Sequence, residues 1–223
     1  MSETAILASW RTNAAAWTTA VREAQIESRR LATDRAIVDA VTSRAPRTLL
    51  DVGCGEGWLA RALAPAGIEV TGVDVTVELI ERARELGGGR FETLSYEQLA
   101  AGALAQTFDA LVCNFSLLGD EPVAALLRAV PRMLTSSGAL IIQTLHPLVA
   151  CGEGRYEDGW RTGSWAGFAP AFTDPPPWYF RTLPSWLALL AHSGLDLVEL
   201  KEPLHPTTGK PASLILIAQP AAK

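Results

Sequence analysis

Residues 48–63 read TLLDVGCGEGWLARAL. An apolar run is followed by three glycines at alternate positions, Gly53, Gly55 and Gly57, and then by a helix-compatible segment that starts at Trp58. Glycine alone turns so tightly and lets the backbone approach a ligand so closely. The start of the following helix presents free N–H groups toward the turn. This stretch therefore predicts a strand, a ligand-binding turn and a helix.

Two acidic residues accompany the turn. Asp51 ends the first strand, and Asp74 ends the second, in the run IEVTGVDV at residues 68–75. A carboxylate at the second position can accept hydrogen bonds from both hydroxyls of a ribose, so the turn and Asp74 predict a nucleoside-bearing ligand. One class of protein that such a turn could indicate is a nicotinamide-dependent dehydrogenase. Its GxGxxG fingerprint would need a glycine where this chain has Trp58, and an acid before the first glycine is foreign to it.

Helices and strands continue to alternate after this unit, which predicts an α/β fold. Further helices are expected at residues 77–86, near Glu97, at 120–134 and at 184–192, and further strands at residues 90–96, 108–116, 138–145, 195–203 and 212–220. Strands this apolar are typical of a sheet covered by helices on both faces. We expect a Rossmann-like, doubly wound, mostly parallel seven-stranded sheet, with an antiparallel pair at its C-terminal edge.

The remaining segments suggest four parts of a single domain. Residues 1–45 form an N-terminal helical appendage or cap, and residues 46–147 form the cofactor-binding core. Residues 148–183 are rich in Gly, Pro, Trp and Tyr and form an insertion, which we interpret as a substrate lid because a loop this long is usually functional. Residues 184–223 supply the closing helix and strands.

Charge and composition exclude several classes of protein. The 223 residues carry a net charge of −5, so no basic surface is expected for a nucleic acid partner. Neither a signal peptide nor a membrane span is recognisable, which predicts a cytoplasmic protein. The three scattered cysteines favour reduced thiols and show no metal-binding spacing, so no metal site is expected.

The segment DVGCGEG, residues 51–57, resembles the first motif of the class I S-adenosylmethionine-dependent methyltransferases, an acidic residue followed by GxGxG. The similarity extends from Thr48 to Leu145, and is greatest to the small-molecule methyltransferases of quinone biosynthesis. It implies S-adenosyl-L-methionine as the cofactor and a small molecule as the methyl acceptor. It also implies a set of cofactor-binding residues: Asp51, Gly53, Cys54, Gly55 and Gly57 for the methionine part, Asp74 and Val75 for the ribose, Asn114 beside the methyl sulfur, and Ser95 and Tyr96 near the adenine, where the family usually has an acid.

Catalytic and substrate-binding residues are less sharply defined. His146 follows the fifth strand, where it could act as a general base for a protic acceptor, or else anchor a loop. Trp10 and Trp17 share a helical face, which is usually core but could line the site. Tyr179 and Arg181 lie in the insertion, and Arg181 could clamp an anionic or aromatic substrate or pin the insertion to the domain.

Arg29 and Arg30 could also face a substrate carboxylate, although a solvated helix face is the better interpretation. Two functions from different classes remain open beside the dehydrogenase. One is a methyltransferase that works by in-line displacement, for which alignment matters more than a dense catalytic cluster. The other is a cofactor-binding or regulatory module without turnover.

Overall fold

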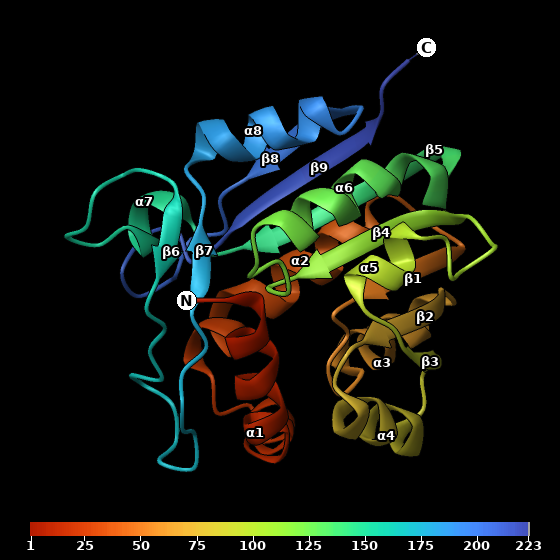
Figure 1. Ribbon diagram of the computed structural model, residues 1–223. Helices are drawn as coiled ribbons and strands as arrows, with labels where there is room; N and C mark the ends of the chain where they lie inside the picture. Colours follow the sequence, from red (N-terminus) through yellow and green to blue (C-terminus); the bar gives the residue numbers. More distant parts are fainter. Residues whose placement is uncertain (223) are drawn as a thin grey trace.

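A seven-stranded sheet forms the centre of the computed structural model, which describes residues 1–222 (Figure 1). Its strands are β1 (Thr48–Val52), β2 (Glu69–Asp74), β3 (Arg90–Thr93), β4 (Phe108–Asn114), β5 (Leu134–Thr144), β8 (Leu195–Lys201) and β9 (Leu214–Pro220). The helices are α1 (Glu3–Arg22), η1 (Arg29–Thr33), α2 (Asp34–Thr42), α3 (Trp58–Leu63), η2 (Ala64–Ala66), α4 (Val77–Leu86), α5 (Tyr96–Ala100), α6 (Glu121–Met133), α7 (Pro147–Ala150) and α8 (Leu183–His192). None of the described helices is both long and apolar enough to cross a membrane.

The strand order is β3-β2-β1-β4-β5-β9-β8. Strands β1 to β5 run parallel, whereas β9 pairs antiparallel with both β5 and β8. The Rossmann-like fold and its antiparallel edge pair, expected from the sequence, are thus confirmed. Because the order reverses at β1, the chain leaves β1 and β4 in opposite directions, and a crevice for ligands forms at their carboxyl ends.

Each face of the sheet is covered by its own layer of helices. Successive residues of a strand point to opposite faces, so Leu49 packs with α2, α3 and α4 while Leu50 packs with α5, α6 and α8. The same alternation separates Val112 from Leu111 in β4, and all four side chains are fully buried. This two-sided core holds the strand ends rigid beneath the site.

The N-terminal appendage is helical, as expected, but it is divided into separate helices. Helix α1 ends at Arg22, and Ala24 takes a left-handed backbone conformation with φ 50°. The chain then enters η1, a single turn of π-helix, before α2. A π-turn of this kind is rare and occurs often at functional sites.

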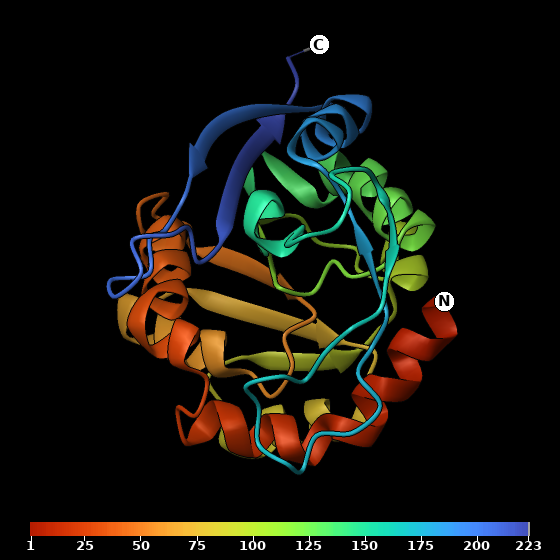
Figure 2. The same cartoon turned by 90° about the vertical axis from the view of Figure 1, so that its left-hand side faces the viewer.

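The insertion at residues 148–183 packs against α1, and Figure 2 shows it (teal) running along α1 (red) and crossing in front of the parallel strands. It contains α7 and a small two-stranded sheet of β6 (Gly159–Arg161) and β7 (Trp178–Phe180), which the sequence did not predict. Asn13 holds it in place: its side chain accepts from the N–H of Thr173 at 2.9 Å and donates to the carbonyl of Thr173 at 2.7 Å. Ser9 donates to the carbonyl of Asp174 at 2.5 Å.

Candidate functional site

The glycine turn joins β1 to α3 in a conformation that other residues rarely adopt. Gly53, Gly55 and Gly57 have φ of 75°, 56° and 81°. A Cβ at Gly53 would lie 2.3 Å from Cβ of Ser116, and a Cβ at Gly57 would lie 2.9 Å from the ring of Phe91. The glycines are therefore required both by the backbone and by the space around it.

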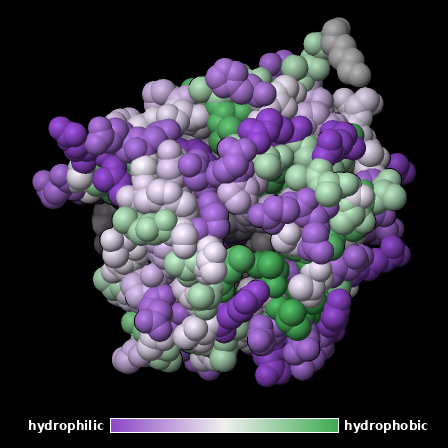
Figure 3. Space-filling model, viewed as in Figure 1, coloured by the Kyte–Doolittle hydropathy of each residue, from purple (hydrophilic) through white to green (hydrophobic). Residues whose placement is uncertain are grey.

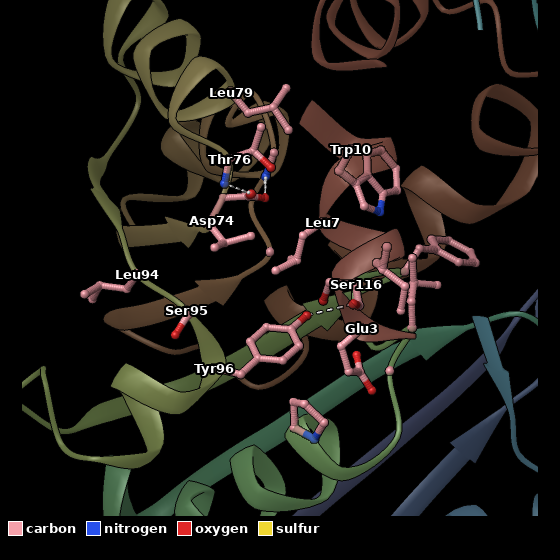
Figure 4. Close-up of a pocket in the computed structure, with 18 of the residues that line it drawn as sticks. Glu3, Leu7, Trp10, Asp74, Thr76, Leu79, Leu94, Ser95, Tyr96 and Ser116 are labelled. Atoms are coloured by element: carbon pink, nitrogen blue, oxygen red, sulfur yellow. Dashed lines mark hydrogen bonds between the residues drawn. The ribbon is translucent and has the colours of Figure 1, made fainter. Parts of the chain in front are cut away.

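Asp74, at the end of β2, is tied to this turn. One carboxylate oxygen accepts from the N–H of Gly55 at 3.0 Å, and the other accepts from the N–H of Thr76 at 2.8 Å (Figure 4). Burial raises the pKa of this carboxyl, while these two hydrogen bonds oppose the rise. The contacts fix the position of Asp74 and leave it lone pairs for a ligand.

Asp74 and the turn line one cavity, which we call the first cavity. Its walls also contain apolar and aromatic residues of α1 and of the loops after β3 and β4, drawn in Figure 4. Glu3, Asp74 and Glu97 line it, and among the described residues no Arg, Lys or His does. On the face shown in Figure 3, hydrophobic side chains reach the surface between α1 and α4, which border this cavity. The first cavity thus suits a ligand that carries positive charge and apolar surface.

Most residues expected to bind the cofactor meet at the first cavity. Those in its lining are Gly53, Gly55, Asp74, Val75, Ser95, Tyr96 and Asn114. Ser95 also caps α5, and the hydroxyl of Tyr96 donates to the carbonyl of Ser116 at 2.7 Å. The acid that the family usually carries in this region has a counterpart one residue later, since Glu97 lines the cavity.

Asp51, Gly57 and Cys54 do not line the first cavity. Cys54 lies in the wall of a neighbouring cavity, while Gly57 packs against Phe91. Asp51 is only 2% exposed, and burial together with the nearby charge of Asp74 raises its pKa to about 7. Asp51 therefore lies under the turn, where its charge can act on a ligand without direct exposure to the cavity.

A second cavity of about 320 Å³ adjoins the first. This volume is within the range of small-molecule sites, which is roughly 300–1,000 Å³. Its wall is largely aromatic and includes Trp10, Trp17, Trp58, Trp165, Trp178, Trp186, Phe115, Phe168, Phe180 and Tyr179. The second cavity is thus suited to a flat or apolar molecule.

The two cavities meet at residues that line both of them: Trp10, Trp17, Gly53, Gly55, Asn114, Phe115 and Leu118. Asn114 has a buried side-chain oxygen without a hydrogen-bond partner. Phe115 is held at φ 54°, a conformation that costs free energy for a non-glycine residue and clusters at functional sites. Two different ligands could therefore contact each other at this boundary.

The sequence comparison assigns this site to a family. Residues 24–200 match the family described as "Methyltransferase domain". The chain belongs to the methyltransferase domain family. The resemblance to class I methyltransferases is confirmed, and the matched range includes the glycine turn, Asp74 and Asn114.

Among curated relatives, the methyltransferase domain is similar to ubiquinone biosynthesis O-methyltransferases. The protein from Methylococcus capsulatus is 34% identical over 113 residues, covering 49% of this chain and 48% of that one. The protein from Haemophilus ducreyi is 31% identical over 108 residues, covering 45% and 46%. The chain is therefore aligned with about half the length of these relatives.

Solved structures share the fold of this methyltransferase domain. An S-adenosylmethionine dependent methyltransferase from Mesorhizobium loti is 23% identical with a TM-score of 0.62, covering 82% of this chain and 97% of that one. Magnesium protoporphyrin IX methyltransferase from Synechocystis, solved with bound SAH, is 19% identical with a TM-score of 0.58, covering 84% and 81%. At these identities the likeness establishes the fold alone.

His146 of the methyltransferase domain lies outside the lining of both cavities, although its neighbours Leu145 and Pro147 line the second. Its side chain is 4% exposed, and Nε2 lies 2.7 Å from a carboxylate oxygen of Glu202. The geometry thus favours the anchoring alternative, in which His146 ties the end of β5 to the segment between β8 and β9. A role as general base remains an untested prediction.

The structure favours the second of the two alternatives for Arg181, and it places Arg29 where the sequence did not lead us to expect it. Arg181 lines the second cavity, but its Nη1 donates to the carbonyl of Gly119 at 2.7 Å and its Nη2 to the carbonyl of Asp120 at 2.9 Å. It therefore pins the insertion, with Tyr179 against its guanidinium at 4.7 Å. Arg29, expected on a solvated helix face, is instead 9% exposed and lines the second cavity.

Several further residues of the site were not predicted. At the first cavity, Glu3 accepts from the N–H of Asp120 at 2.8 Å and joins α1 to the loop before α6. At the second cavity, Trp58 and Thr33 complete the wall around Arg29. The break between α1 and α2 places Arg29 and Thr33 there, and no local pattern at residues 23–28 signals where the chain turns. Trp58 could have been suspected from its position directly after the glycine turn.

Proposed function

We propose that this protein is an S-adenosylmethionine-dependent methyltransferase that transfers a methyl group to a small-molecule acceptor. One observation carries the proposal: an acidic cavity on the glycine turn and Asp74 opens directly onto an aromatic cavity of small-molecule size. Membership of the methyltransferase domain family supports it. The small-molecule chemistry named for the similar O-methyltransferases of ubiquinone biosynthesis favours an acceptor of that size.

The residues of the first cavity fit S-adenosylmethionine. Asp74 would accept hydrogen bonds from the ribose, and the bare backbone of Gly53 and Gly55 would lie against the methionine part. The negative charge of Glu3 and Asp74 complements a cation, and the unpaired oxygen of Asn114 lies where the two cavities meet. Asp51, beneath the turn, would add to the negative potential when ionised.

When bound, S-adenosylmethionine supplies a methyl group that its positive sulfonium has already activated. The protein then has to hold the acceptor in line and keep water away. Asn114 and Phe115 sit at the boundary between the cavities and would position the acceptor atom. The aromatic wall would orient a flat acceptor, and residues 148–183, fixed to α1 through Asn13, would act as the lid that excludes water.

Calorimetric titration with S-adenosylhomocysteine tests the cofactor site. We expect binding by the wild-type protein, about 10- to 100-fold weaker binding by Asp74→Ala on the scale of charge-assisted hydrogen bonds, and unchanged binding by Asp196→Ala, a matched change at an exposed aspartate. Absence of binding by the wild type, or unchanged affinity in Asp74→Ala, contradicts the proposal.

Formation of S-adenosylhomocysteine with phenolic, quinol and amine acceptors tests turnover. Production above the acceptor-free rate supports an enzyme, whereas binding without turnover across the panel favours a cofactor-binding module. A thermal-shift comparison of S-adenosylhomocysteine with NAD separates both from a dehydrogenase, because only the ligand that binds the native state raises the unfolding temperature.

A further inference from the structure

Arg29 is a buried cation in the wall of the second cavity. Its Nε donates to a carboxylate oxygen of Asp34 at 2.8 Å. The guanidinium lies 4.5 Å from the ring centre of Trp58 and 5.6 Å from that of Trp17. These contacts hold the planar group in one orientation, while its buried Nη2 has no hydrogen-bond partner. A buried donor without an acceptor is costly, which points to a partner that the chain itself does not supply.

Thr33 adds a second unpaired group from the same π-turn. It is 1% exposed, lines the second cavity, and its hydroxyl oxygen also lacks a partner. Arg181, the other cation in this wall, has both Nη atoms engaged by the loop at Gly119 and Asp120. Within the described chain, Arg29 is thus the cavity-lining cation that remains available to a ligand, and Thr33 supplies a buried, unpaired hydroxyl beside it.

Charge separates the second cavity from the first. Three carboxylates line the first cavity, whereas in residues 1–222 neither Asp nor Glu lines the second, which carries two arginines. Asp34 balances one edge of Arg29 from outside the lining. An anionic group in the second cavity would therefore meet attraction from Arg29 without repulsion from the wall.

We propose that the methyl acceptor is an aromatic carboxylate, bound with its carboxylate on Arg29 and Thr33 and its ring against the aromatic wall. The inference rests on the proposed function, since it names the substrate class of the same site. Two unpaired donors match the two oxygens of a carboxylate, and a guanidinium favours planar oxyanions. The ring substituent of the bound acceptor would then face the cavity boundary at Asn114, beyond which the methyl donor would bind in the first cavity.

Paired probes that differ only in charge test this proposal. The probes are 3,4-dihydroxybenzoate and 3,4-dihydroxybenzamide, with 2-naphthoate and 2-naphthamide as a larger pair. Each is titrated by calorimetry into the protein alone and into the protein saturated with S-adenosylhomocysteine. We expect at least one carboxylate to bind about tenfold or more tightly than its amide, as one charge-assisted hydrogen bond allows.

Variants locate the preference. Arg29→Gln should bring the ratio of the two affinities to about one, whereas Arg30→Gln, at the exposed neighbouring arginine, should leave it unchanged. Thr33→Val should weaken carboxylate binding a few-fold and amide binding by less, because the neutral carbonyl of the amide is the weaker acceptor. If Arg29→Gln does not fold, the wild-type ratio and Thr33→Val decide the matter.

Failure of this inference differs from failure of the proposed function. Equal affinity for carboxylate and amide, binding of neither pair, or a preference that survives in folded Arg29→Gln overturns the aromatic carboxylate. If the wild-type protein does not bind S-adenosylhomocysteine, the methyltransferase proposal is overturned instead. The titrations without that ligand then still measure the preference for carboxylate over amide.

Discussion

Nη1 of Arg181 donates a 2.7 Å hydrogen bond to the carbonyl oxygen of Gly119. The two residues belong to the insertion and to the loop between β4 and α6, and Arg181 is 5% exposed. Nη2 continues the contact to the carbonyl and the carboxylate of Asp120, whose N–H in turn donates to Glu3 of α1. One buried guanidinium therefore joins the insertion to the loop beside the first cavity, and Asp120 connects that loop to α1.

Replacing Arg181 with Met should loosen this junction. The change leaves the carbonyls of Gly119 and Asp120 without their donors, and we expect the free energy of unfolding to fall by about 2–4 kcal/mol. Chemical denaturation measures it. Arg155→Met, at an arginine of the same insertion whose side chain is 84% exposed, is the control and should change the free energy of unfolding by less than about 0.5 kcal/mol. Equal effects of the two changes would contradict the pinning role.

Gly53→Ala should damage the fold through a clash and not through backbone conformation alone. Gly53 and Gly67 have nearly equal φ, 75° and 73°, but an added Cβ meets Ser116 at 2.3 Å at Gly53 and no atom within 4 Å at Gly67. We expect Gly67→Ala to cost about 1–2 kcal/mol from the left-handed conformation, and Gly53→Ala to cost clearly more. The difference between the two unfolding free energies isolates the steric contribution.

Asp51→Asn should stabilise the ligand-free protein at high pH. Burial raises the pKa of Asp51 to about 7 from its ordinary value of 3.8, so the folded state holds a proton that the unfolded state has lost. The free energy of unfolding therefore falls as pH rises from about 4 to about 7, and the penalty is complete above that range. The variant lacks this penalty and should exceed the wild type by a few kcal/mol at pH 8 and by almost nothing at pH 4.

The measurement is chemical denaturation at both pH values, with Asp196→Asn as the exposed control. We expect the same Asp51→Asn variant to bind S-adenosylhomocysteine more weakly. A buried carboxylate that lowers the stability of the ligand-free protein is expected to contribute to ligand binding instead. A variant that is no more stable than the wild type at pH 8 would exclude a raised pKa at this position.

His146→Gln should lower the stability of the protein without affecting proton transfer during the reaction. The change removes the 2.7 Å contact to Glu202 and should lower the unfolding free energy by about 1–3 kcal/mol. The pH dependence of kcat should keep its shape, measured with whichever acceptor gives turnover. Loss of the acidic limb of that profile, with stability intact, would instead identify His146 as the base.

The fold and the first cavity could be predicted because their signals are local. Gly53, Gly55 and Asp74 follow directly from the ends of two apolar strands, and parallel strands bring those ends to one edge of the sheet. The backbone conformation at the turn strongly favours glycine, so the turn can be recognised from the spacing of its glycines in the sequence. Trp10 and Trp17 could be nominated by helical spacing, but only the docking of α1 brings them to the wall.

The second cavity could be predicted only in part: Trp10, Trp17, Tyr179 and Arg181 were expected at a substrate site and line it, whereas Arg29 was not expected there. Arg29 and Arg181 are the same residue type, so the sequence does not distinguish them. Their roles depend on which distant groups they contact in the fold. The carbonyl partner of Arg181 lies 62 residues earlier, at Gly119, and satisfies it. Arg29 follows the break at Ala24, whose left-handed backbone turns the chain into the wall. Such long-range pairings leave no periodic trace in the sequence.

The paired hydrogen bonds between Asn13 and Thr173 have a consequence for engineering specificity. They unite two stretches 160 residues apart into a single structural cassette, whereas the glycine turn belongs to the sheet. A chimera that exchanges residues 148–183 alone would strand Asn13 and Ser9 without their backbone partners. To transfer a new acceptor preference to this protein, the insertion and the facing part of α1 therefore have to be exchanged together.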